Sequence, residues 1–311
     1  MGELSGGSPP PRRPLLLVDA ASLYFRAFYA LPKTIVDSHG QPVGAVYGFI
    51  DAIAALASFA QPAGIVCCMD ADWRPAFRVS LVPSYKAHRA GPDGSEAVPA
   101  DLAAQVPLVE RILAAIGIPT VGVAGFEADD VIASLARRWE GPVDIATGDR
   151  DLFQLVDDSR DRRVLFLTRG FRAPQVVDDA YVRARYGIPA SRYADFAVLR
   201  GDPSDGLPGV PGIGEQTAAR LVAEFGSLDG VLAAAHDNAT GLAARLRGRI
   251  LASADYIEAA RAVVVTRDDV PVPPTSELMV GLPDPDLASL SAELGVSGPV
   301  GRLLEVLASL R

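Results

Sequence analysis

Short apolar runs alternate with amphipathic stretches through the first half of the chain. Five of the apolar runs have the length and composition of buried strands: 15–19 (LLLVD), 64–70 (GIVCCMD), 118–123 (IPTVGV), 143–149 (VDIATGD) and 163–168 (RVLFLT). Continuous apolar strands separated by helical periodicity are typical of a largely parallel sheet with helices packed on it. The pattern therefore predicts an α/β fold.

Three of these runs end in an aspartate, namely Asp19, Asp70 and Asp149. In parallel sheets, functional groups gather outside the carboxyl ends of the strands. Aspartate is also a good N-cap for a following helix, and for any one of the three this structural interpretation is equally acceptable. Three strand-end acids together favour a functional site.

Further acids lie in three short motifs. In GFEADDVI, helical spacing places Glu127 and Asp130 on one face, and TGDRD repeats the strand-end acid two residues later. Each motif alone could instead complement the dipole of a helix N-terminus. The candidates in these motifs are Glu127, Asp129 and Asp130, then Asp149 with Asp151, and finally Asp202 and Asp205 in RGDPSD.

Electrostatic repulsion decides whether such a set of acids would need bound cations. Two carboxylates about 6 Å apart repel by roughly 3 kcal/mol at an effective dielectric constant of 20. A converging cluster therefore needs cations, and a dense set of hard oxygen ligands favours Mg²⁺ or Mn²⁺. The scattered His39, His88 and His236 argue against zinc. Two divalent ions could hydrolyse a phosphodiester without a protein nucleophile. Spacing alone does not establish convergence.

The segment 71–100 has a different character. Its first half mixes the cations Arg74, Arg78, Lys86 and Arg89 with the aromatic residues Trp73, Phe77 and Tyr85, and its second half is rich in Gly, Pro and Ser. Basic and aromatic residues in this mixture suit phosphate contact and base stacking, so we expect a flexible cover over the site. A solvated surface insertion is the alternative.

From about residue 178 the pattern is helical, with the glycine-rich stretch GLPGVPGIGEQTAARLVAEFG at 206–226. Gly209, Gly212 and Gly214 allow tight turns, and Thr217 begins an alanine-rich helix. Exposed amides at such a turn could hold a DNA phosphate, although helix connections often use glycine for packing alone. The rest of the chain is helical with a proline-rich break near 271–274.

Composition sets wider bounds. The 311 residues include 49% hydrophobic residues, enough for a buried core, and the adjacent Cys67 and Cys68 in an apolar run are expected to be buried, unreactive thiols. No signal-peptide pattern and no membrane-length apolar run occur, so we expect a cytoplasmic protein. Without nine candidate acids the formal charge of −9 becomes zero, so the acidic total is weak evidence against DNA binding.

Across nearly its whole length the sequence resembles the 5′-nuclease family, which includes flap endonucleases and the exonuclease domain of bacterial DNA polymerase I. The matching stretches, in family order, are LLLVDAASLYFRAFYA, CCMDADWRPAFR with SYKAHR, GFEADDVIASLA, ATGDRDLFQLV and RGDPSDGLPGVPGIGEQTA. The resemblance implies a PIN-like nuclease domain at 15–177 after a tail at 1–14. It implies a helical arch near 71–100, and a helical DNA-binding region at 178–311 with a helix–three-turn–helix element near 204–226.

The resemblance also implies roles for individual residues. Lys86, Arg78 and Arg89 would contact the scissile phosphate or gate the 5′ strand, with Lys86 stabilising transition-state charge. Other expected DNA contacts are Arg26, Phe28, Arg74, Tyr85, Gly209, Gly212, Gly214 and Thr217. Two or three Mg²⁺ or Mn²⁺ ions would bind the nine acids Asp19, Asp70, Glu127, Asp129, Asp130, Asp149, Asp151, Asp202 and Asp205.

Further implications concern the turn and the substrate. The resemblance implies a K⁺ ion at the turn near Gly212 and Gly214. Gln216, where relatives often have Lys, and Gly206, where Asn is frequent, depart from the family pattern. We expect a monomeric, stand-alone enzyme acting on DNA with 5′ ends or 5′ flaps. The alternatives are a PIN-type ribonuclease and a non-catalytic DNA-structure-binding paralogue.

Overall fold

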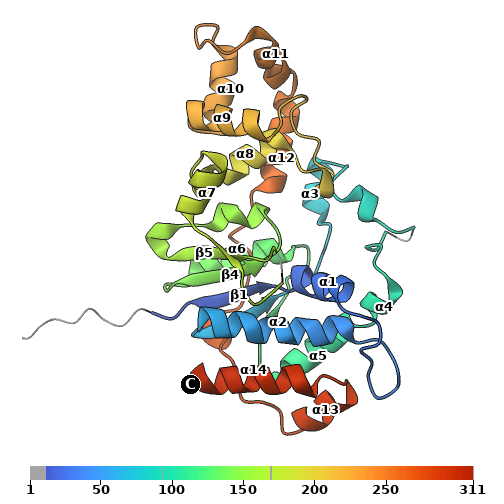
Figure 1. Ribbon diagram of the computed structural model, residues 1–311. Helices are drawn as coiled ribbons and strands as arrows, with labels where there is room; N and C mark the ends of the chain where they lie inside the picture. The colour runs from blue at the N-terminus through green and yellow to red at the C-terminus, as the bar shows by residue number, and fades with distance from the viewer. Residues whose placement is uncertain (1–11, 93, 169, 311) are drawn as a thin grey trace, which may run out of the picture.

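The computed structural model, which describes residues 12–310 except 93 and 169, contains a six-stranded sheet in the order β3-β2-β1-β4-β5-β6 (Figure 1). All five predicted strands are present and parallel to one another. The sixth strand pairs antiparallel with β5 at the edge and is only three residues long, too short to show a pattern. The strands are β1 (Leu15–Asp19), β2 (Gly64–Cys68), β3 (Thr120–Val121), β4 (Val143–Thr147), β5 (Arg162–Phe166) and β6 (Gln175–Val177).

Helices cover both faces of the sheet, which explains why its strands are apolar throughout. In β1, Leu15 and Leu17 face one core and Leu16 and Val18 face the other. One face packs on α6 (Ala128–Arg138), and the other packs on α1 (Ala20–Ala30), α2 (Gly44–Ala60) and α5 (Val106–Ile116). Cys67 and Cys68 are fully buried, as expected, and burial raises the pKa of both thiols.

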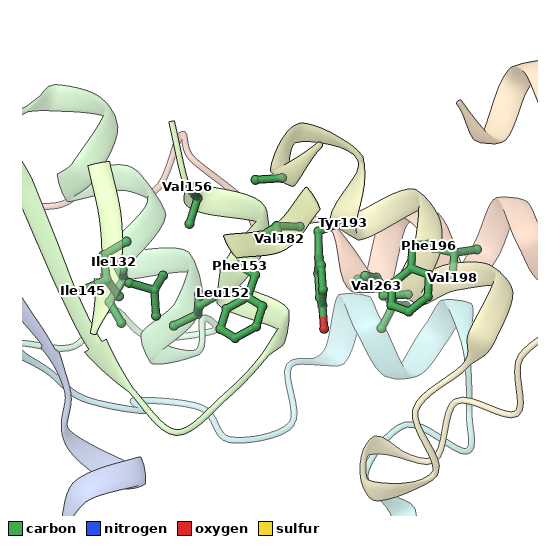
Figure 2. Packing of buried hydrophobic residues seen from close by; sticks show 14 of the residues in the cluster. Ile132, Ile145, Leu152, Phe153, Val156, Val182, Tyr193, Phe196, Val198 and Val263 are labelled. Atoms are coloured by element: carbon green, nitrogen blue, oxygen red, sulfur yellow. The ribbon is translucent and has the colours of Figure 1, made fainter. Parts of the chain in front are cut away.

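A helical region continues the core on the α6 side of the sheet (Figure 1). Its junction with the sheet is aromatic: the ring of Phe153 lies 5.0 Å from that of Phe166 and 5.3 Å from that of Tyr193. Figure 2 shows Phe153 and Tyr193 beside Val182, with Phe196 and Val263 farther along the same core. The helices are α7 (Asp179–Tyr186), α8 (Tyr193–Arg200), α9 (Glu215–Phe225), α10 (Leu228–His236), α11 (Ala244–Ala252) and α12 (Ala254–Val264).

The last two helices return to the opposite side of the sheet instead of joining this region. In α14 (Ser297–Leu310) the apolar residues Val300, Leu303 and Leu307 recur at helical spacing and pack in the core that contains α2, together with α13 (Leu287–Glu293) (Figure 1). The expected single helical region at 178–311 therefore does not include its last quarter. Periodicity identifies these helices but not the partner of their apolar face.

The arch segment, residues 71–100, leaves the carboxyl end of β2 and contains little helix. It holds α3 (Ala76–Leu81) and a 3-10 turn at Ala87–Arg89, and α4 (Ala100–Ala103) begins at its end. Its middle is docked on the turn after α8, where Lys86 N–H donates to the Asp205 carbonyl at 2.8 Å and Ser84 Oγ donates to the Gly206 carbonyl at 2.8 Å. Gly206 has a φ of 72°, and a Cβ there would lie 2.1 Å from the Ser84 carbonyl oxygen. Glycine at this position therefore permits the docking.

Two predicted site residues, Arg78 and Asp130, instead form a buried ion pair. Arg78 Nη1 and Nη2 donate to the two carboxylate oxygens of Asp130 at 2.8 and 2.7 Å, and Arg78 Nε donates to the Val263 carbonyl at 3.0 Å. Glu127 shares the face of Asp130, as its spacing predicts, and lies 3.6 Å from Arg78. The pair therefore ties α3, α6 and α12 together. Arg78, only 2% exposed, is corrected from a phosphate contact to a structural residue, and Asp130 from a metal ligand to its partner.

No helix in the described part of the chain combines the length and the apolar character that crossing a membrane requires.

Substituting Arg78 tests this correction. Arg78→Met keeps the length of the side chain but leaves the Asp130 carboxylate buried without its cation, so the free energy of unfolding should fall by about 3 to 5 kcal/mol. Urea unfolding measures the change. Arg137→Met is the matched control, because Arg137 is exposed and pairs with exposed Asp268, and it should cost about 0.5 kcal/mol at most. Equal stability of the two variants would contradict the structural role.

Candidate acidic site

An open cavity of about 760 Å³ lies at the carboxyl ends of β1, β2 and β4, between the sheet and the turn after α8. Residues from all five acidic motifs reach it, so the convergence that spacing could not establish is present in the fold. Two further acids that the sequence analysis did not single out, Glu96 and Glu215, complete its acidic lining. The predicted acids that line it are Asp19, Asp70, Glu127, Asp129, Asp149, Asp202 and Asp205.

The strand-end acids also act as helix caps. Asp19 Oδ1 accepts from Ser22 N–H of α1 at 3.1 Å, and its Oδ2 accepts from the Thr147 hydroxyl at 2.6 Å. Asp70 Oδ1 accepts from Ala128 N–H, at the start of α6, at 2.7 Å. An acid at a strand end can therefore cap a helix and line the cavity at the same time, because the carboxyl ends of the strands face both the helix N-termini and the cavity.

Asp149 and Asp151 form a tight loop beside the cavity, with Asp149 in its lining. Asp149 Oδ1 accepts from Asp151 N–H at 2.8 Å, which turns the second acid back toward the first. Asp151 does not line the cavity itself. Its Oδ1 is buried with no hydrogen-bond partner, and the closest cation is Arg200 Nη2 at 3.8 Å. A buried carboxylate oxygen without a donor is the arrangement expected where a cation should bind.

Burial and mutual repulsion shift the protonation of the cluster. Burial, with the nearby Asp70 and Asp149, raises the pKa of Asp19 to about 7, and burial raises the pKa of Glu127 to about 7 despite the nearby Lys86 and Arg78. Burial and the neighbouring carboxylates raise the pKa of Asp129 and Asp151 well above the usual range. Burial thus favours the neutral forms of these four carboxyl groups when no cation is bound.

The cations of the arch segment are paired with the acids of the cavity. Lys86 Nζ donates to Glu127 Oε2 at 2.7 Å, and Arg89 Nη2 donates to Asp205 Oδ1 at 2.7 Å. Both line the cavity, as predicted for residues that meet a phosphate there. In this arrangement they act as internal counter-ions of the acidic cluster.

Two other arch residues hold the segment together. Tyr85 is 4% exposed and its hydroxyl donates to Glu127 Oε1 at 2.9 Å, so its ring is not available for stacking on a base. Arg74 Nε donates to the Tyr85 carbonyl at 2.6 Å and its Nη2 to the Pro83 carbonyl at 2.9 Å. We therefore correct both from DNA contacts to supports of the arch.

Arg26 and Phe28 do not line the cavity. Arg26 Nη1 donates to the Thr168 carbonyl at 3.4 Å, and the ring of Phe28 packs against the core with its edge toward Tyr29. The aromatic residues that line the cavity are Phe25 and Trp73. Phe25 lies closer to the start of α1, which follows the strand end at Asp19, whereas Phe28 is about one turn farther along the same helix.

The glycines of the glycine-rich turn differ in exposure: one is buried against the chain and two are exposed. Gly209 is buried: its N–H donates to the Tyr256 hydroxyl at 2.9 Å, and a Cβ there would lie 2.4 Å from the Arg200 carbonyl oxygen. Gly209 therefore serves chain packing and not DNA. Gly212 and Gly214 are exposed, and Gly214 caps α9, with Thr217 half-exposed in the first turn of that helix.

The sequence analysis missed Arg200, the last residue of α8. Its Nη2 lies 3.8 Å from Asp151 and 3.6 Å from Asp202, and its guanidinium stacks 5.1 Å from the centre of the Phe196 ring. Arg200 thus bridges two acidic motifs. Arg200 is the first residue of the motif RGDPSD. Its position directly before the acids of this motif is the signal from which the sequence could have identified it.

The cluster is not a finished metal centre. Within the described residues, no three acidic, histidine or cysteine side chains stand at the spacing of the ligands of one ion. The donor set nevertheless consists of carboxylate oxygens, and Asp151 Oδ1 is buried without a hydrogen-bond partner. Such donors fit hard divalent cations, which these carboxylates would hold.

Family models match most of the chain: residues 14–187 match the 5′-3′ exonuclease N-terminal resolvase-like domain, and residues 188–286 match the 5′-3′ exonuclease C-terminal SAM fold. The chain belongs to the 5′-3′ exonuclease family. The two models divide at 187/188, after α7, ten residues beyond the expected division at 177/178. The predicted family and α/β fold with a helical second part are confirmed.

Individual relatives agree with this assignment. A 5′-3′ exonuclease of Streptomyces coelicolor is 50% identical over 94% of this chain and 99% of its own length, and one of Mycobacterium tuberculosis is 47% identical over 96% and 99%. DNA polymerase I of Mycobacterium bovis is 37% identical over 85% of this chain but only 28% of its own length.

Solved structures share the fold at low identity. A bacteriophage T5 flap endonuclease, in a pseudo-enzyme–product complex with DNA and metal ions, has a TM-score of 0.63 at 17% identity, covering 96% of this chain and 99% of its own. The catalytic core of Rad2 in complex with DNA substrate has a TM-score of 0.58 at 20% identity, covering 96% and 93%.

The raised pKa values predict how stability depends on pH. The folded state keeps protons on Asp19 and Glu127 up to about pH 7, whereas the unfolded chain loses them near pH 4. The folded state therefore binds more protons, and in chelating buffer the free energy of unfolding should fall between pH 6 and pH 8 by about 1 kcal/mol per group.

Urea unfolding at several pH values measures this slope. Asp19→Asn should flatten it, whereas Glu110→Gln, which removes an exposed acid from α5, should leave it unchanged. Stability that stays constant or rises from pH 6 to pH 8 would show that these groups are ionised in the folded protein.

Proposed function

We propose that this chain is a divalent-metal-dependent nuclease that hydrolyses DNA phosphodiesters at 5′ ends and 5′ flaps. One observation carries the proposal: carboxylates from five separate sequence motifs line one cavity, together with Lys86 and Arg89 of the arch segment. Membership of the 5′-3′ exonuclease family supports the reaction class. The T5 and Rad2 complexes, which contain DNA, support DNA as the partner.

The acids that line the cavity, together with Asp151 beside it, would hold the metal ions. Bound divalent ions supply a water of lowered pKa and stabilise the charge on the leaving oxygen. The protein holds the ligands in place beforehand, since Thr147 and the start of α1 orient Asp19, and Ala128 N–H orients Asp70. Arg200 holds Asp151 and Asp202 near one another before cations enter.

The arch cations would meet the scissile phosphate. Lys86 and Arg89 pair with Glu127 and Asp205 in the absence of substrate, and a phosphate entering the cavity offers them a second anionic partner. A cation whose position is fixed before reaction stabilises the negative charge that develops on the phosphate. The rings of Phe25 and Trp73 in the cavity wall provide surfaces on which unpaired bases of a 5′ strand could stack.

Finer features belong to the proposal as well. We expect Mg²⁺ or Mn²⁺ as the ions, because the donors are carboxylate oxygens. A K⁺ ion at the Gly212 turn, a monomeric state and a cytoplasmic location stay predictions from the sequence.

A cleavage assay with 5′-labelled flap DNA tests the proposal. Wild-type protein should cut near the flap junction only with Mg²⁺ or Mn²⁺ present, and Asp149→Asn or Asp202→Asn should lower the rate by at least about 100-fold while the Kd for flap DNA stays within about threefold, because the substitutions remove ligands but no DNA contacts.

Glu110→Gln is the matched control for loss of one acid, since Glu110 is exposed on α5, and it should cut at the wild-type rate. Metal-independent cutting, or full activity of both aspartate variants, would overturn the mechanism. Preference for an RNA strand of the same structure would favour the ribonuclease alternative.

Lys86 offers a separate test, because the chain has one other lysine, Lys33, which is exposed and paired with Asp101. Lys86→Ala should lower the single-turnover rate by about 100-fold with a much smaller change in Kd, and Lys86→Arg should restore part of the rate. Lys33→Ala should behave as wild type. Parallel losses of rate and binding in Lys86→Ala would assign the residue to substrate binding alone.

A further inference from the structure

Three of the cations that line the acidic cavity lie close to its carboxylates, and one of them differs in its contacts. Lys86 and Arg89 each donate a hydrogen bond of 2.7 Å to an acid. Arg200 Nη2 instead lies 3.8 Å from Asp151 Oδ1 and 3.6 Å from Asp202 Oδ2, and both distances exceed the length of a hydrogen bond. The charge of Arg200 therefore attracts two carboxylates without occupying their oxygen atoms.

The two oxygen atoms nearest Arg200 are suited to binding an ion. Asp151 Oδ1 is buried and has no hydrogen-bond partner. Asp202 uses its other oxygen, Oδ1, to accept from the Ser204 N–H at 2.8 Å, so the turn that follows does not engage the oxygen nearest Arg200. A buried carboxylate oxygen without a donor keeps its lone pairs for a hard cation.

Contacts that do not involve the acids hold the Arg200 side chain in place. Its Nε donates to the Gly201 carbonyl at 3.0 Å, and its guanidinium lies 5.1 Å from the centre of the Phe196 ring, one turn earlier on α8. Its backbone is confined as well, because a Cβ on Gly209 would lie 2.4 Å from the Arg200 carbonyl oxygen. The positive charge therefore stays at this position when an ion takes the carboxylates.

We propose that Arg200 is a positioning residue with two opposing effects: it holds Asp151 and Asp202 together in the metal-free protein, and it weakens binding of the divalent ion that these two acids would hold. The inference rests on the proposed function and adds a determinant of its metal affinity. A fixed unit charge a few ångströms from the ligand oxygens repels a divalent ion, and even at the dielectric constant of water this repulsion weakens binding roughly tenfold.

The direction of the effect distinguishes this role from a purely supporting one. If Arg200 only supported the loops that carry Asp151 and Asp202, its removal would let the two acids move apart and would weaken metal binding. If Arg200 also repels the ion, its removal should strengthen metal binding although it destabilises the metal-free protein. Stability and metal affinity therefore change in opposite directions under the proposal.

Calorimetric titration of the whole chain with Mn²⁺ alone measures the affinity. Arg200→Met should lower the Kd for Mn²⁺ about tenfold, whereas Arg200→Lys, which keeps the charge, should stay within about threefold of wild type. In chelating buffer, Arg200→Met should also unfold at a lower urea concentration than wild type. Arg192→Met is the matched control, because Arg192 directly precedes α8, at the end away from Arg200, and pairs with Asp195 at 3.5 Å. It should keep the wild-type Kd for Mn²⁺.

The outcomes separate the inference from the proposed function. An unchanged or higher Kd for Mn²⁺ in Arg200→Met, with metal binding by the wild type intact, would overturn the inference and leave the proposed function standing. Where Arg200→Met does not fold, Arg200→Gln removes the same charge, keeps a polar group and carries the same expectation. A wild-type protein that neither binds Mn²⁺ nor cuts flap DNA would reject the proposed function, and the inference with it.

Discussion

Repulsion among buried carboxylates is the constraint on which the rest of this structure depends. The parallel strands, the helices that follow them and the turn after α8 bring acids from five motifs to one edge of the sheet, where burial raises the pKa of Asp19 and Asp129. Lys86, Arg89 and Arg200 offset part of this charge. The docking of the arch segment follows directly, because two of these three cations are on it. Lys86 and Arg89 pair with Glu127 and Asp205, which are among the acids that would hold the proposed metal ions.

Charged residues that pair with one another inside the core support the fold, whereas acids that line the cavity belong to the candidate site. Arg78 and Asp130 bind one another through both nitrogen atoms and both oxygen atoms, out of reach of solvent, and the pair joins three helices. Asp129, the adjacent residue, lines the cavity, and burial raises its pKa well above the usual range. Asp129 and Asp130 thus have different roles, because one helical step of about 100° turns the side chain of Asp129 toward the cavity and that of Asp130 into the core.

The rotation of about 100° between successive helical residues also limits what the sequence could predict about the site. Strand ends, the order of the acidic motifs and the α/β class follow from local patterns, and all appear in the fold. Which of two adjacent acids faces the cavity depends on helix rotation, so Asp130 was placed wrongly. Which aromatic ring reaches the cavity depends on its distance along α1 from the strand end, so Phe28 was placed there and Phe25 was missed. Tyr85 and Gly209 have the residue types of a DNA surface, but tertiary contacts bury them. The return of α14 to α2 depends on long-range packing that periodicity does not encode.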